Sequence, residues 1–217
     1  MDRKEFLERR HAEETDFTGV DFTGVDLSRV TFGQIDLTWA NLTDANLTGA
    51  SLGNVNLTEA NLRNAKLDLA RIGGNLKQAS FVNASFRGCD FGIRMKMEKA
   101  NFLRANLEGT QLFGANLIGA NLSEARLMNT DLTEANLGGA NLTGAFLEGA
   151  NLTRTRLRGA NLRRVTLSRA ILIETNFGSI PDFSVHFDQT FFWNTILPDG
   201  TVITEPCYKS WYDWYDR

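Results

Sequence analysis

Apolar residues recur at every fifth position along most of this chain. Phe, Leu or Ile occupies that position without a break from Phe17 to Ile72, and again from Phe102 to Phe177. A small residue, usually Ala, stands two positions before each of them, and Asn or Asp stands one position before in most copies. A helix would place residues five apart about 140° out of step, and a strand would put them on opposite faces. The pattern therefore predicts a chain that bends once per repeat and coils into a solenoid with the leucines inside.

The individual repeats share one motif. The triplet Ala-Asn-Leu recurs at 40–42, 45–47, 60–62 and many later places. In these repeats the chain resembles the pentapeptide repeat family, whose motif is A(D/N)LXX. The resemblance covers residues 15–197 and implies an all-β fold, a right-handed quadrilateral parallel β-helix with four repeats per coil. The number of copies then predicts roughly nine coils.

Two register slips interrupt the period. Ile72 to Leu76 is one residue short, at a pair of glycines, and Phe91 to Phe102 is one residue long. Glycine suits the first slip, where the backbone must deviate. We expect the second slip to bulge outward as a small loop over residues 92–99. Both slips can be explained as neutral sequence drift in a tolerant surface. The basic residues and methionines of the second slip leave a binding role open as the alternative.

A coil of four repeats would stack residues that are twenty apart in sequence. Glu134, Arg154 and Glu174 would then alternate in sign, while Asp16 would stack unfavourably on Asp36. One asparagine column would let side-chain amides form hydrogen bonds along the axis. Its members are Asn101, Asn121, Asn141 and Asn161. Cys89 takes an inward small-residue position, which predicts a buried and unreactive thiol.

Both ends of such a solenoid need covering, because an open coil exposes apolar side chains and strand edges. We expect residues 1–14 to form a short helical cap with Phe6 and Leu7. Residues 198–217 are expected to form a C-terminal cap or tail, either closing the last coil or acting as a dimerisation surface. Its turn at 197–201 resembles the end of many cyanobacterial family members. The aromatic residues of this cap or dimer surface are Trp211, Tyr212, Trp214 and Tyr215.

Nothing in the sequence predicts catalysis. The paired glycines lack the Lys-Ser/Thr of a nucleotide loop, and His11 and His186 stand far apart without metal-ligand spacing. We therefore expect no enzyme, no cofactor and no metal. The charged N-terminus and the lack of a long apolar run indicate a soluble cytoplasmic protein without a membrane span.

A band of arginines is the sharpest charge feature. Residues 151–180 hold six arginines and one glutamate, in a chain with net charge −3. By the coil model these arginines encircle about one turn, either as a solvated belt or as a docking surface for an acidic partner or nucleic acid. Phe113, Phe146 and Trp39 are expected to point outward and are candidate partner anchors. The arginines are Arg154, Arg156, Arg158, Arg163, Arg164 and Arg169.

Three functions remain open. The favoured one is a rigid scaffold that binds an unknown protein partner, as a monomer or a C-terminal homodimer. The second follows from the family resemblance, which implies that some members mimic DNA and modulate type II topoisomerases such as gyrase. The arginine band makes this chain a poor mimic, and binding to nucleic acid itself is not expected. The third is regulation in cyanobacterial signalling, for which no residue here argues.

Overall fold

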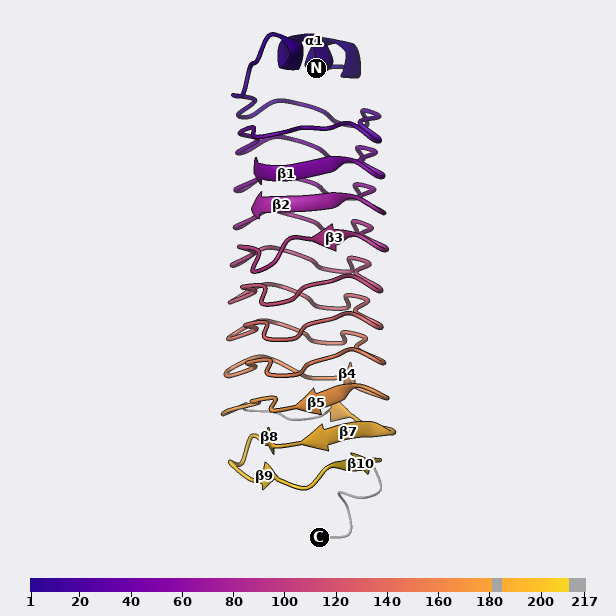
Figure 1. Cartoon of the computed structure of the whole chain (residues 1–217), viewed down its shortest axis with the longest axis vertical. Coiled ribbons are helices and arrows are strands. Elements are labelled where there is room, and N and C mark those ends of the chain that lie inside the picture. Colours follow the sequence, from indigo (N-terminus) through magenta and orange to yellow (C-terminus); the bar gives the residue numbers. More distant parts are fainter. Residues whose placement is uncertain (181–184, 211–217) are drawn as a thin grey trace.

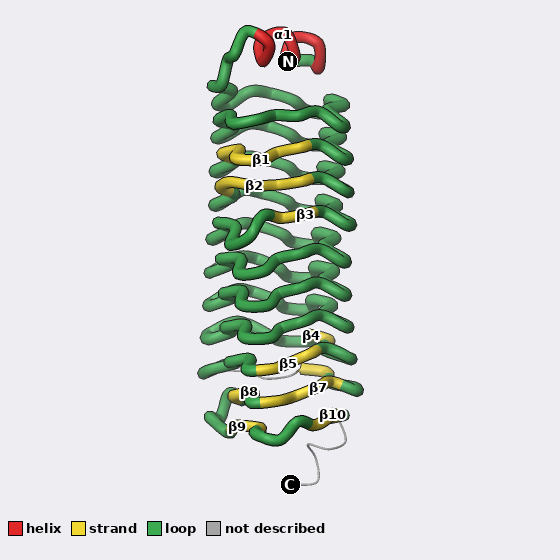
Figure 2. The backbone as a smooth tube through the Cα atoms, viewed as in Figure 1, coloured by secondary structure: helices red, strands yellow, loops and turns green. Residues whose placement is uncertain are grey.

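The chain forms a stack of coils with one helix over its first coil. The computed structural model describes residues 1–180 and 185–210. Helix α1, Arg3–His11, lies at one end of the stack, and strands β9 and β10 lie at the other (Figure 1). Most of the wall is extended backbone and tight turns between short strands (Figure 2). The strands are β1 Ser51–Asn56, β2 Arg71–Asn75, β3 Asp90–Phe91, β4 Val165–Thr166, β5 Ile171–Ile173, β6 Val185–His186, β7 Thr190–Trp193, β8 Thr195–Ile196, β9 Val202–Ile203 and β10 Cys207–Lys209.

Neighbouring coils are joined by parallel β-bridges between residues about twenty apart. The bridges form four columns, which we call faces 1 to 4. Face 1 runs from Asp16 to Ile196, and face 2 from Asp21 to Asn161. Face 3 runs from Asp26 to His186, and face 4 from Thr31 to Phe191. The predicted stride of twenty is therefore confirmed. The right-handed sense of the coil and the number of coils, roughly nine, stay predictions.

The predicted columns exist. The four asparagines of the predicted column bridge one another on face 2, and the Asn121 amide donates to Oδ1 of Asn101 at 3.1 Å. Asp16 also bridges Asp36 on face 1, as expected. More often the asparagine or aspartate oxygen accepts the backbone N–H two residues later, as Asn151 does from Thr153 at 3.0 Å. This local hydrogen bond explains why Asn and Asp are preferred just before the inward leucine.

The Leu positions are buried along the whole described stack, and so are most of the small-residue positions before them. Val20 and Val25 in the first coil are partly buried, and Gly74 is exposed. Six threonines also take the inward small-residue position, which the sequence reasoning had assigned mainly to Ala and Val. Their hydroxyl groups are satisfied inside, as in the 2.8 Å bond from Thr155 Oγ1 to the carbonyl oxygen of Leu132 in the previous coil. Five of these threonines therefore tie neighbouring coils together from within, while Thr110 donates to Leu107 in its own coil. The six threonines are Thr110, Thr130, Thr155, Thr175, Thr190 and Thr195.

The first register slip is a shortened corner. Strands β1 and β2 pair Leu52 with Ile72 but Val55 with Gly74, so the lower strand has one residue fewer. Gly74 has φ of 113° and is exposed, and a side chain on it would overlap the backbone of Val55. Only glycine fits this conformation and this space. The prediction of a glycine-dependent slip is confirmed.

The second slip differs from the predicted loop. Met95 and Met97 are buried, with 3% and 0% of their surface exposed, so they continue the inward pattern. The extra residue is confined to the turn at 92–94, and the expected bulge over residues 92–99 was wrong. A methionine is flexible and apolar enough to fill an inward Ala or Leu position, which is why the repeat was missed.

Helix α1 covers the open end of the first coil, as expected. Asp2 caps its N-terminus by accepting the Glu5 amide at 2.9 Å. Phe6 is fully buried against Phe17 and Phe22, with ring centroids 5.0 and 5.2 Å apart. The helix thus seals the aromatic interior that a bare coil would expose.

At the other end the chain reverses direction. Strand β9 pairs antiparallel with β8, and β10 pairs antiparallel with β7. Ser210 then donates to Asp188 at 2.9 Å. The four aromatic residues predicted as a cap or dimer surface, Trp211, Tyr212, Trp214 and Tyr215, lie outside the described residues.

Candidate interaction surface

The six arginines surround the stack as the belt that the sequence predicted, and all are exposed. Arg156 belongs to the bridges of face 1, and Arg154 follows the segment of face 4 that contains Asn151. Arg163 and Arg164 follow Asn161 on face 2, and Arg169 follows Thr166 on face 3. We call these six residues the arginine belt.

The belt arginines differ in their partners. Arg154 makes ion pairs with Glu134 and Glu174, and Arg169 donates to Gln189 at 3.3 Å. Among the described residues, no carboxylate pairs with Arg156, Arg158 or Arg164. Arg156, Arg158 and Arg164 are thus exposed belt arginines to which the described part of the chain supplies no counter-charge.

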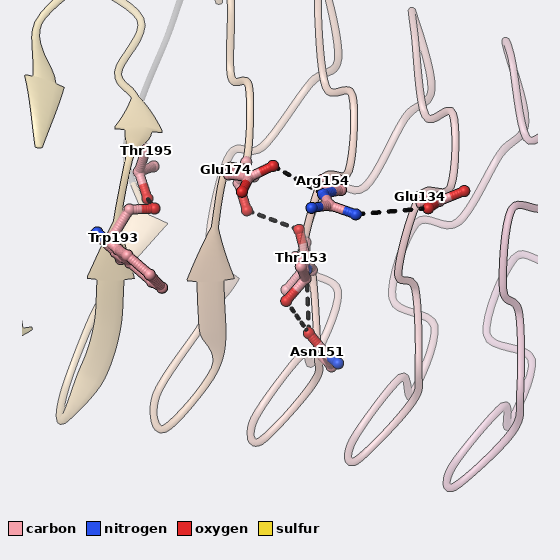
Figure 3. A network of polar contacts seen from close by, with 9 residues as sticks. Glu134, Asn151, Thr153, Arg154, Glu174, Trp193 and Thr195 are labelled. Carbon is pink, nitrogen blue, oxygen red and sulfur yellow. Dashed lines mark hydrogen bonds and ion pairs between the residues drawn. The ribbon is translucent and has the colours of Figure 1, made fainter. Parts of the chain in front are cut away.

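Arg154 is part of a ladder of charges at the corner between faces 4 and 1. Its Nε donates to Glu174 at 2.7 Å, and its Nη1 lies 3.9 Å from Glu134 (Figure 3). The alternating column predicted from the stride is confirmed. The hydrogen bond from Arg154 lowers the pKa of Glu174 below its ordinary value and raises that of Arg154. Each of these corner residues has φ between 53° and 60°, so the turn aims their side chains along the column.

One step of this ladder has no side chain. Gly114 occupies the corner between Arg94 and Glu134, and the Arg94 side chain extends across it to reach Glu134 at 4.0 Å. A concavity of about 490 Å³ lies here, between these corner residues and the bridged residues of face 1. Its lining residues are Arg94, Gly114, Asn116, Glu134, Asn136, Arg154 and Arg156.

A second concavity, also of about 490 Å³, lies near the C-terminal end and is mainly apolar. The rings of Phe191 and Tyr208 form one wall, with centroids 5.1 Å apart. Arg169 stands at its edge and connects it to the arginine belt. The sequence reasoning missed this groove, because β10 brings Tyr208 beside face 4 by a chain reversal that the repeat does not encode. Its lining residues are Arg169, Ile171, Ile173, Gln189, Phe191 and Tyr208.

The predicted aromatic anchors are not equivalent. Phe146 and Trp39 are exposed, at 43% and 62%, and the Trp39 indole donates to Glu59 at 3.0 Å. Phe113 is half-buried and is therefore less accessible to a partner than the other two. Stacked coils lie only about 4.8 Å apart, and the neighbouring coils therefore cover part of a large ring. The three residues are also on different faces and do not form one patch.

We also searched the described residues for a metal site, a membrane-spanning helix and a reactive cysteine. Residues 1–180 and 185–210 contain no cluster of His, Cys, Asp and Glu suited to a metal ion. Within the same ranges, no helix has the length and apolar character that crossing a membrane requires. Burial raises the pKa of the Cys89 thiol, with smaller contributions from Asp90 and Asp68, and this agrees with the predicted unreactive cysteine.

Comparison with solved structures finds the same architecture in other repeat proteins. HetL from the cyanobacterium Nostoc sp. strain PCC 7120, described as involved in heterocyst differentiation regulation, is 26% identical. The match covers 93% of this chain and 99% of HetL, with a TM-score of 0.52. Trypsin-treated QnrB1, a plasmid-mediated fluoroquinolone resistance protein, is 21% identical over 80% of this chain and 90% of QnrB1, with a TM-score of 0.58. The QnrB1 likeness shows a shared fold alone.

A comparison with curated protein sequences finds no match. The family model for pentapeptide repeats, in contrast, matches residues 11–34, 35–74, 110–149 and 150–179 with eight copies. These ranges make up more than half of the chain, and they include the coils that present the arginine belt. The bridged four-faced stack and this match agree, and the chain belongs to the pentapeptide repeat family.

Proposed function

We propose that this protein is a non-enzymatic interaction module that binds an acidic segment of a partner protein through the arginine belt. The observation that carries the proposal is that Arg156, Arg158 and Arg164 are exposed and form no ion pair within the described residues. Elsewhere on the stack, Arg104 and Arg126 lie opposite glutamates of neighbouring coils, at 2.8 and 3.8 Å. Arg29, Arg63 and Arg87 also have no ion pair in the described ranges, but they lie in separate coils, whereas residues 151–180 bring together six arginines and one glutamate. The three belt arginines have no such counter-charge within the described ranges, and an acidic partner would supply it.

The fold favours binding through a rigid surface. Successive coils are joined by backbone hydrogen bonds on every face, as between Leu137 and Arg156 at 2.8 Å. Inward threonines add further bonds from coil to coil, such as Thr175 Oγ1 to the Leu152 carbonyl oxygen at 2.7 Å. A surface held in this way loses little conformational entropy on binding, and this lowers the cost of association.

The likeness to HetL supports a regulatory use of such a surface. That protein is similar along nearly its whole length and is described as taking part in the regulation of heterocyst differentiation. We infer a comparable class of role here, in which binding a partner changes the activity of that partner. A cyanobacterial source and a cytoplasmic location belong to this proposal.

The alternative of a DNA mimic that modulates a type II topoisomerase has less support. A mimic of DNA needs a continuous negative surface, whereas cations interrupt each face of this stack. Arg156 stands on face 1, Arg104 follows Asn101 on face 2, Arg126 lies on face 3 and Arg71 lies on face 4. The likeness to QnrB1 concerns the fold and adds nothing to this alternative.

Charge reversal tests the proposed function. The triple variant R156E/R158E/R164E removes the unpaired part of the belt. The matched control R29E/R63E/R87E reverses three other exposed arginines in coils nearer the N-terminus. We expect the wild-type protein and the control to bind acidic sequences on a peptide array, and the belt variant to bind them at least about tenfold more weakly.

Two results would overturn the proposal. One is the absence of binding to acidic peptides by the wild-type protein, and the other is an equal loss in both triple variants. A gyrase supercoiling assay and a duplex DNA gel-shift accompany the array. Inhibition of supercoiling by wild-type protein without binding to acidic peptides would favour the DNA-mimic alternative.

A further inference from the structure

The concavity at Gly114 has the shape of a small binding pocket. The corner positions before and after Gly114 carry the long side chains of Arg94 and Glu134, so the glycine leaves a notch between them. The notch exists because Gly114 adds no side chain of its own, whereas equivalent corner positions such as Arg94 and Glu134 carry one at a similar φ. A Cβ atom at this position would lie 2.8 Å from Cγ of Arg94.

The lining of the pocket is strongly cationic. Arg94, Arg154 and Arg156 contribute three guanidinium groups, against the single carboxylate of Glu134. Arg94 and Arg154 lie 4.0 and 3.9 Å from that carboxylate, and Arg154 also donates to Glu174 at 2.7 Å. Arg156 is therefore the guanidinium of the pocket for which the described residues supply no carboxylate. Since a guanidinium carries five N–H groups, an anion in the pocket would find free donors on Arg156.

Asn136 and Arg156 are the two hydrogen-bond donors on the face 1 side of the pocket. Asn116 also lines this side, but its amide already donates to Glu98 at 2.8 Å. Asn136 uses its Oδ1 to accept the Gly138 amide at 3.1 Å, which turns its NH2 group away from that turn. Arg156 stands one coil further along the same column and has no ion-pair partner among the described residues. An oxygen pair placed in the notch would meet Arg156 and Asn136 from one side and Arg94 from the other.

We propose that this pocket binds the carboxylate of an aspartate or glutamate side chain presented by an acidic protein segment. This inference rests on the proposed function and assigns the anchoring point within it. The fork of Arg156 matches the two oxygens of a carboxylate, and the neighbouring cations place the charge of the ligand at the corner. The remaining unpaired belt arginines, Arg158 and Arg164, would contact flanking residues of the segment.

The test uses the full chain and a fluorescein-labelled hexaglutamate peptide. Binding is measured by fluorescence anisotropy for wild type, Arg156→Ala, Gly114→Asn, the belt variants Arg158→Ala and Arg164→Ala, and the distant control Arg63→Ala. Asparagine is suited to fill the notch, because Asn64 and Asn129 occupy equivalent turn positions with φ of 58° and 56°. We expect Arg156→Ala and Gly114→Asn each to weaken binding at least about fivefold, and Arg63→Ala to leave it unchanged. In NMR spectra, the peptide should shift the backbone amide of Gly114 and the side-chain amide of Asn136.

The outcomes separate this inference from the proposed function. If the peptide binds but only Arg158→Ala and Arg164→Ala weaken it, the pocket assignment is wrong and the belt remains the docking surface. If the peptide binds neither at the belt nor in the pocket, both proposals are overturned. If inorganic phosphate shifts the Gly114 and Asn136 signals while the peptide does not, the pocket is a phosphate site and the carboxylate assignment fails. Circular dichroism of each variant confirms that the stack is intact.

Discussion

The backbone of Gly74 lies directly against the backbone of Val55 in the coil before it. A Cβ atom on Gly74 would overlap the carbonyl oxygen of Val55 and would lie 2.9 Å from its amide nitrogen. These atoms belong to the paired strands β1 and β2, so neither can move without disturbing the ladder. The shortened corner thus depends on the absence of one side chain.

Replacing Gly74 by alanine is therefore expected to destabilise the protein severely. The overlap with backbone atoms and the φ of 113° together predict a loss of more than about 3 kcal/mol in the free energy of unfolding. The control is Gly139→Ala, where φ is 63° and no atom lies within 4 Å of the added Cβ. That variant should lose only about 1–2 kcal/mol. Equal losses in urea denaturation of the two variants would contradict the steric explanation.

Removing the Phe6 side chain should undock helix α1. Phe6 is fully buried among Phe17, Phe22 and Phe32, and truncation of such a residue costs about 3–5 kcal/mol. The exposed first coil would then promote association of one stack with another. Light scattering of Phe6→Ala should show a mass that rises with concentration, while the half-buried control Leu7→Ala stays closer to wild type. A Phe6→Ala protein with unchanged mass and stability would show that α1 is not a cap.

The five-residue period predicted which residues stack only together with the four repeats per coil that the family resemblance implies. Asn101 and Asn121 are hydrogen-bonded neighbours, and Glu134 and Arg154 are charge partners, because a closed coil of four repeats fixes both relationships. The pocket at Gly114 could not be predicted in the same way. It depends on Arg94 reaching across a missing side chain to Glu134, two coils away, and a repeat pattern does not specify such a side-chain conformation.

The inward threonines should contribute to stability through their coil-to-coil hydrogen bonds. In Thr155→Val the shape is kept but the bond to the Leu132 carbonyl oxygen is lost. We expect this to cost about 1 kcal/mol, or about 2–4 °C in Tm for a chain of this size. The control Thr153→Val changes an outward, partly buried hydroxyl two residues earlier and should have a smaller effect. A larger drop in Tm for the outward variant would refute the assigned role.

Asp36 should make the first coils sensitive to acid. The Oδ1 atom of Asp36 accepts the Thr38 hydroxyl at 2.5 Å and the Thr38 amide at 2.8 Å. These bonds lower the pKa of Asp36, despite opposing burial and the charge of Asp16. Because the pKa is lower in the folded state, the stabilisation is present above the unfolded pKa of about 4 and is lost as the pH falls below it.

The variant Asp36→Asn separates this effect from general acid denaturation. Asparagine accepts the same bond at any pH, as Asn56 does from the Thr58 amide at 3.2 Å. The variant also removes the repulsion between Asp16 and Asp36. The Tm of Asp36→Asn, measured from pH 7 to pH 3, should therefore fall less steeply than that of wild type. Parallel curves would mean that Asp36 does not contribute to the acid sensitivity.

The stride of twenty residues also limits how such a gene can change in length. Duplicating a segment of twenty codons would add one complete coil and leave every later side chain on its original face. Duplicating five codons would instead move each later residue to the next face, so that pairs such as Arg154 and Glu174 survive only when both lie on the same side of the insertion. Growth by whole coils is therefore the route that lengthens the protein while preserving the arrangement of side chains on each face.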